Sequence, residues 1–147
     1  MAKDIIERWI RISWDDSAQG ARDITPSLVP GSLSGGGKTF DEVEMTGVSD
    51  EMKNFLAGHS NSEIGAQFYV DTTATTGAFT VLMGTEGLTQ TLTLQFGTAG
   101  APVTGDPEWE GEYTLLQAEL GLAGNKPVIN ARWLPGTATA AAWGTVA

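Results

Sequence analysis

The sequence contains no cysteine and only one histidine, His59. Without thiols the chain can form no disulfide bond, thiolate nucleophile or cysteine-based metal site. The only side-chain ligands available for a zinc site would be this one imidazole and carboxylates. Any Ser-His-Asp triad would also have to use His59, whose place in the segment GHSN is typical of an ordinary exposed polar residue. We therefore expect no metal, no other cofactor and no enzymatic activity.

Positive charge is scarce. The chain has 8 Lys and Arg against 18 Asp and Glu, a formal net charge of −10, and no Lys or Arg between Lys53 and Lys126. A protein that holds nucleic acid by its phosphates needs a basic surface, so this function class is excluded.

Long apolar runs are absent as well. Charges interrupt every apolar run of the first residues, MAKDIIERWIRISW, so we expect no signal peptide and no secretion. Nothing in the chain approaches the ~20 apolar residues of a membrane-spanning helix, and we expect no membrane partner.

What the chain does contain predicts a mainly β fold. Its 147 residues fit one domain, residues 1–147, and its 19 glycines separate short runs that alternate apolar and polar residues. This pattern favours a β-sandwich or partial barrel with one packed helix. Residues 78–83 fit either a short helix or a strand. We predict strands at about 8–14, 40–45, 64–70, 88–96, 108–120 with a bulge at 115–116, and 126–134.

The helix is predicted at about residues 50–57. Ser49 is a favourable N-cap, and Asp50 and Glu51 place negative charge in the first turn. Phe55 and Leu56 would belong to one apolar face, and the glycine at position 58 would end the helix.

An acidic row is the most distinctive local pattern. Glu108, Glu110 and Glu112 occupy every second residue of a predicted strand, so the three carboxylates line one face at a spacing of ~7 Å. A glycosidase would need one such carboxyl in an apolar pocket, whereas three on one face are typical of a solvated surface. We interpret the row as an exposed acidic face.

A long, mostly irregular segment is predicted at about residues 15–38. Long loops without secondary structure are usually functional or disordered. Its part SLSGGGKT, residues 32–39, misses the phosphate-binding loop G-x-x-x-x-G-K-[ST] because Ser32 replaces the first glycine and a strand pattern follows. A flexible loop is the favoured interpretation. The loop residues that we select as candidates are Asp15, Asp16, Arg22, Asp23, Ser32, Gly35, Gly36, Gly37 and Lys38.

Three segments together resemble a known family. They are RISWDDSAQGARDITPSL at 11–28, FDEVEMTGVSDEMKNFLAGHSNSEIGAQFYVDTTAT at 40–75 and GEYTLLQAELGLAGNKPVINARWLPGT at 111–137. Their order resembles that of the tail tube (major tail) proteins of long, non-contractile-tailed bacteriophages. The match consists of small structural motifs spread over most of the chain, and none of them is catalytic.

The resemblance implies a structural virion protein. Six copies would form a ring, and rings would stack into the tail tube through which double-stranded DNA passes without specific binding. The loop at 15–38 would reach the next ring, and the row Glu108, Glu110 and Glu112 would be a candidate for the wall of the lumen. Implied partners are further copies and the tape-measure, terminator and distal tail proteins. The implied location is the virion tail, assembled in the bacterial host cytoplasm.

Two alternatives stay open from the sequence. A capsid decoration (cement) protein is also small, β-rich and oligomeric. A carbohydrate-binding β-module would use exposed members of the 5 tryptophans. The glutamate row is compatible with an outer, solvated face as well as with a lumen.

Overall fold

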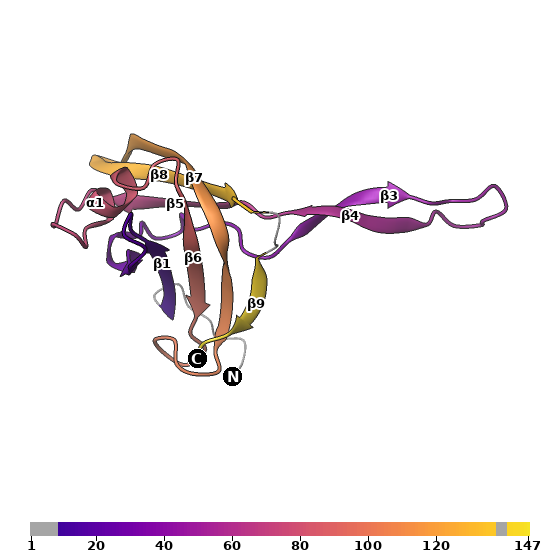
Figure 1. The fold of residues 1–147 in the computed structure, drawn as a ribbon, viewed down its shortest axis with the longest axis horizontal. Helices are drawn as coiled ribbons and strands as arrows, with labels where there is room; N and C mark the ends of the chain where they lie inside the picture. The colour runs from indigo at the N-terminus through magenta and orange to yellow at the C-terminus, as the bar shows by residue number, and fades with distance from the viewer. Residues whose placement is uncertain (1–8, 138–140) are drawn as a thin grey trace.

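The computed structural model describes residues 9–137 and 141–147, and it consists of a β-rich body from which a two-stranded arm projects (Figure 1). A short 3-10 helix, Thr25–Ser27, follows the second strand. The other elements are β1 Ile10–Asp15, β2 Ala21–Asp23, β3 Thr39–Glu44, β4 Phe55–Asn61, β5 Ile64–Tyr69, α1 Ala78–Met83, β6 Thr89–Phe96, β7 Pro107–Ala123, β8 Lys126–Pro135 and β9 Ala142–Thr145.

The body is one 7-stranded sheet in the order β2-β1-β6-β7-β8-β5, with β9 also paired to β7. Strand β7 is 17 residues long and belongs to both layers of the body. Its first half pairs with β6 and β9, and its second half pairs with β8. The register shifts between Leu115 and Gln117, a β-bulge at which the strand can bend. The sheet thus packs against itself without closing into a barrel.

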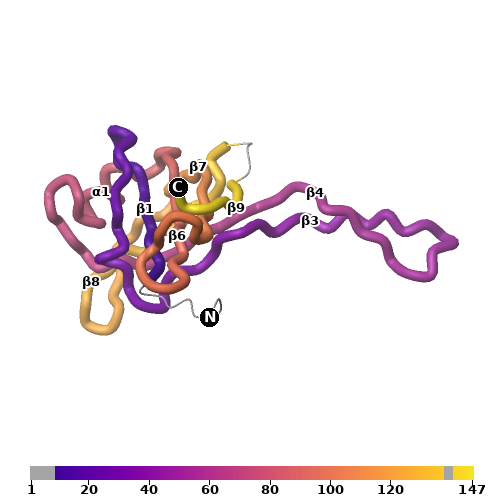
Figure 2. Tube along the Cα trace, turned by 90° about the horizontal axis from the view of Figure 1, so that it is seen from below, coloured from indigo at the N-terminus to yellow at the C-terminus, as the bar shows by residue number. Residues whose placement is uncertain are grey.

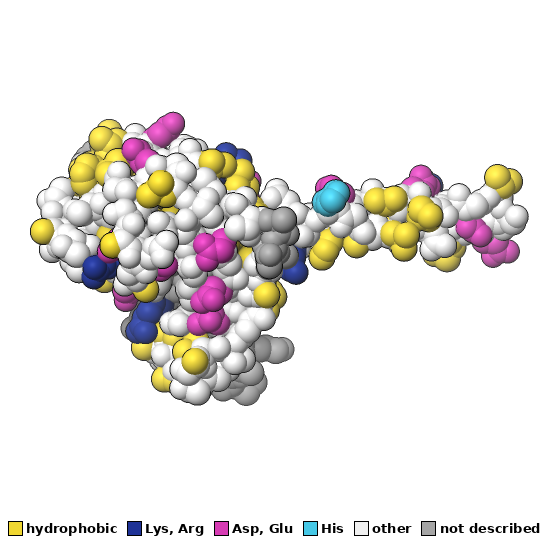
Figure 3. All heavy atoms as spheres, viewed as in Figure 1, with side chains coloured by type: hydrophobic (Ala, Val, Ile, Leu, Met, Phe, Trp, Pro, Cys, Tyr) yellow, Lys and Arg dark blue, Asp and Glu magenta, His cyan; other side chains and the backbone are white. Residues whose placement is uncertain are grey.

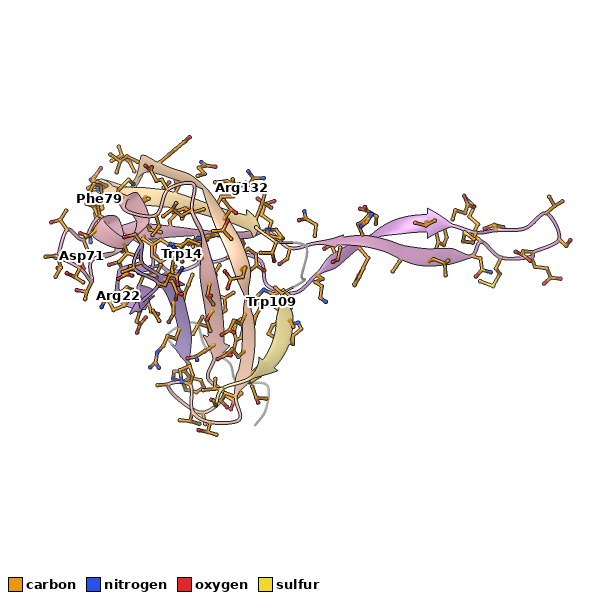
Figure 4. All side chains as sticks on the ribbon, viewed as in Figure 1. Trp14, Arg22, Asp71, Phe79, Trp109 and Arg132 are labelled. Carbon is orange, nitrogen blue, oxygen red and sulfur yellow. The ribbon has the colours of Figure 1, made fainter. Side chains whose placement is uncertain are left out.

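Buried aromatic residues fill the space between the layers. Trp14 from β1 meets Trp133 from β8 with ring centroids 5.7 Å apart, and Phe68 from β5 contacts Trp133 edge to face. The indole of Trp109 donates to the hydroxyl of Tyr113 at 2.8 Å. Figure 4 shows Trp14 and Trp109 inside the body. These contacts hold the sheet that carries the acidic row.

Most of the predicted strands are confirmed, and so is the mainly β fold class. The predicted bulge at 115–116 coincides with the register shift in β7. Residues 78–83, which fitted either element, form α1. The strand expected at 8–14 is β1, although its first expected residue, Arg8, lies outside the described residues.

The predicted helix at 50–57 is wrong. Phe55 begins β4, and β4 pairs with β3 so that Leu56 lies opposite Val43. The carboxylate of Asp50 accepts from the backbone N–H of Gly47 at 2.7 Å in the turn between the strands, so it caps a turn and not a helix. A helix of two turns is marginal in water unless its apolar face packs on something. Here β3 provides cross-strand partners for Phe55, Leu56 and Ala57.

Candidate functional surfaces

The glutamate row lies on the outward face of the sheet. Trp109 is buried in the core, so its neighbours on β7 point away from the core, and Glu110 and Glu112 are exposed while Glu108 is half-buried. The register places Glu108 opposite Gln95 and Glu110 opposite Thr93 on β6. In Figure 3 acidic side chains form a column on this part of the body. The structure thus brings the three predicted residues together on one solvated face.

Polar side chains of β6 hold the three carboxylates. Thr91 donates its hydroxyl to Glu112 at 2.5 Å, Thr93 donates to Glu110 at 3.3 Å, and the amide of Gln95 donates to Glu108 at 2.8 Å. These donors are neutral, so they orient the carboxylates without removing their charge. The face therefore keeps a dense negative charge in a fixed arrangement.

The field of this row reaches the end of β1. The pKa of Asp15 is raised above its ordinary value, first by partial burial and then by repulsion from Glu112, Asp16 and Glu110. Asp16 behaves in the opposite way. Its pKa is lowered, first by the backbone N–H of Gly20 and then by a hydrogen bond from Arg22. Adjacent aspartates therefore contribute to stability with opposite signs.

Replacing Asp15→Asn should stabilise the protein at neutral pH. Because the folded state holds the Asp15 proton more tightly than the unfolded state, stability falls as pH rises through the raised pKa, and the penalty is complete above it. The amide removes this penalty. We expect the variant to have a higher Tm than the wild type at pH 7, and the gain should vanish below the ordinary aspartate pKa of 3.8. Thermal unfolding followed by circular dichroism across this pH range measures the difference.

Asp16→Asn is the matched control with the opposite sign. A lowered pKa contributes stability above pH 3.8 that is lost as pH falls through the folded-state value. This variant should therefore have a lower Tm than the wild type at pH 7 and should approach it in acid. Equal shifts of the same sign in both variants would contradict the assigned fields.

The segment at 15–38 is mostly irregular, as the sequence predicted, but it is not an excursion away from the body. Residues 21–23 form β2 on the edge of the sheet, and Leu28 and Ser34 form bridges to Phe68 and Gly65 of β5. Some of its backbone hydrogen bonds close local turns, and others go to the body, from the N–H groups of Ile24, Val29 and Ser34 to Ile12, Gln67 and Gly65. This segment is held along the body and does not project from it.

The candidate residues of this segment fall into two groups. Asp16 accepts from Arg22 at 2.9 Å in the turn between β1 and β2, and Asp23 pairs with Arg11 at 3.6 Å. Residues 32–38 lie beside β5, where Ser34 bridges to Gly65, and then continue into β3 at the base of the arm. The structure does not bring the two groups together as one site.

The glycine triplet is required by the backbone. Gly35 has φ +103°, a left-handed conformation that favours glycine, and a Cβ there would meet the carbonyl oxygen of Glu63 and lie 2.9 Å from the Cα of Ile64. At Gly35 the chain therefore passes very close to the backbone at the start of β5. Nothing in this geometry calls for a phosphate.

Gly35→Ala should lower stability by about 2–4 kcal/mol, through backbone strain together with the displacement of β5. Gly31→Ala is the control, because Gly31 has φ +78° but nothing within 4 Å of the added methyl. It should cost only the strain of about 1–2 kcal/mol. Urea unfolding of both variants tests the difference. Equal losses would show that the close approach to β5 contributes nothing.

The arm exposes an unusual amount of apolar surface. All residues of β3 are exposed, as are all those of β4 except the half-buried Gly58. Its strands form a separate 2-stranded sheet that points away from the body (Figure 2). Large hydrophobic residues exposed on the arm are Phe40, Val43, Met45, Val48, Met52, Phe55 and Leu56. A surface of this kind is typical of a protein–protein contact.

Two strands leave open edges on the layer that carries the acidic face. Within residues 9–137 and 141–147, β2 has only β1 as a strand partner and β9 has only β7. Unpaired strand edges are ready-made sites for pairing with another chain. The acidic face is therefore bounded on both sides by edges that could continue the sheet.

No protein-family model matches the chain, and no curated protein matches it. None of the helices in the described part of the chain is long and apolar enough to cross a membrane.

Sequence reasoning missed the arm. Part of the signal was available, since the strand at 40–45 was predicted and residues 46–54 include the turn formers glycine, serine, asparagine and aspartate, but FLAGHSN has no clear alternation. The helical spacing of Met52, Phe55 and Leu56 obscured it.

Proposed function

We propose that the protein is a structural subunit that assembles with copies of itself into stacked rings and forms a tube for the passage of double-stranded DNA. The observation that carries the proposal is the projecting arm, whose hydrophobic side chains an isolated subunit would leave in water. The motifs that resemble phage tail tube proteins support the same assignment. The location that this function requires is the tail of a virion.

The acidic face suits the wall of such a tube. DNA phosphates repel a surface that carries Glu108, Glu110 and Glu112, so DNA would slide along it without being held. Pairing of the free β2 edge of one copy with the free β9 edge of the next would continue this sheet from subunit to subunit. The row would then form an acidic ring around a central channel.

Electron microscopy of the purified protein, together with sedimentation velocity over a range of concentrations, tests the proposal. We expect rings with a central channel and stacks of rings at high concentration. A trimer that binds capsid shells would instead indicate a decoration protein. A protein that stays monomeric at every concentration would overturn self-assembly.

A further inference from the structure

We infer that the arm of one copy docks on a second apolar surface of the next copy, at the turn between β7 and β8. This inference rests on the self-assembly proposed above and names the contact that performs it. The second surface consists of Leu120 and Leu122, hereafter the leucine pair. Their exposed fractions are 66% and 73%, among the largest of any hydrophobic side chains of the body.

The leucine pair continues the core, and nothing within residues 9–137 and 141–147 covers it. Leu120 lies opposite Ile129, which is fully buried, and Leu122 lies opposite Pro127. Residues two apart on a strand share a face, so both leucines point to the side of the sheet that elsewhere packs on the opposite layer. In Figure 3 apolar side chains gather at the end of the body where β7 and β8 turn.

The arm and the leucine pair cannot satisfy each other within one molecule. The arm leaves the body at one end, whereas the turn between β7 and β8 projects from the side away from the arm (Figures 1 and 2). Two different complementary surfaces on one subunit make a head-to-tail contact, which produces rings or continuous stacks. A second copy of the chain is therefore the occupant that supplies what each surface lacks.

Charge does not oppose this contact. The arm carries five acidic residues, Asp41, Glu42, Glu44, Asp50 and Glu51, against one lysine, Lys53. Lys126 begins β8 opposite Ala123, on the other face of the hairpin from the leucine pair, and its ammonium lies 5.4 Å from the centroid of the Tyr69 ring. Glu119 alternates with Leu120 and therefore also lies on the other face, so the acidic arm would meet no carboxylate of this hairpin beside the leucine pair.

Cross-linking tests the contact directly because the chain has no cysteine of its own. Copies carrying Val43→Cys, Met52→Cys or Leu56→Cys on the arm are mixed with tagged copies carrying Leu122→Cys and treated with a short bis-maleimide. We expect cross-linked pairs between arm copies and Leu122→Cys copies. Val103→Cys is the control on the receiving copy, because Val103 is 63% exposed but lies in the loop between β6 and β7.

A second measurement uses the double variant Leu120→Ser, Leu122→Ser. Both side chains are exposed, so the subunit should fold, and the concentration for half-assembly should rise at least about tenfold. Val103→Ser should leave assembly unchanged. If the wild type assembles but the double variant assembles equally well, or the arm cross-links to itself or to the control position instead, this inference is overturned and self-assembly stands. A wild type that never assembles overturns both.

Discussion

Removing the arm should abolish self-assembly while leaving the body folded. In the variant, Asn-Gly replaces residues 40–60 and joins Thr39 to Asn61, which lie opposite each other at the arm's base. Asn-Gly is the preferred two-residue turn between paired strands. No residue of the arm belongs to the hydrophobic core, so the Tm of the body should change by only a few degrees. Sedimentation velocity should show a monomer at concentrations where we expect the wild type to assemble.

A double substitution separates the chemistry of the arm from its length. Val43 and Leu56 lie opposite each other and are 43% and 58% exposed. Val43→Thr with Leu56→Thr keeps residues that suit a strand but makes the pair polar. We expect most of the loss in assembly that the deletion causes. Rings that form normally without the arm would remove the main support for the proposed function.

The sequence predicted what depends on local alternation. The run from Glu108 to Tyr113 defined both the strand β7 and the face of its glutamates, because side chains alternate along a strand whatever its neighbours are. The bulge near Leu115 was also visible, since two adjacent leucines break the alternation. Each of these features depends on only a few consecutive residues.

What the sequence could not predict depends on which strands pair. The spacing of Met52, Phe55 and Leu56 satisfies a helix, and only the match of Leu56 to Val43 across the hairpin decides for strands. Likewise, the pairing of β7 with three strands, including β9 from near the end of the chain, follows from tertiary packing. The open edges and the leucine pair become visible only once that pairing is known.

Reversing the charge of the acidic face should turn a surface that repels DNA phosphates into one that binds them. Glu108→Lys, Glu110→Lys and Glu112→Lys together place three cations where the wild type has three carboxylates. Three new phosphate contacts from a single subunit predict a slope of about −2.7 in log K against log salt, roughly a 40-fold loss of affinity between 50 and 200 mM salt, and a duplex that touches several subunits should show a steeper slope. Fluorescence anisotropy of a short duplex with the assembled protein measures this slope. The wild type should show no binding.

Two controls complete this experiment. The first separates the effect of charge from an effect on structure, and the second shows whether the bound DNA lies inside the channel or on the outer surface. Replacing the same three residues by Gln keeps an acceptor for Thr91 and Thr93 but removes the charge, so it should preserve assembly without binding DNA strongly. Nuclease digestion then locates the bound duplex. If the glutamate row lines the channel, DNA held by the lysine variant is shielded and survives digestion. If the bound DNA is cut as fast as free DNA, the row faces outward and serves solubility alone.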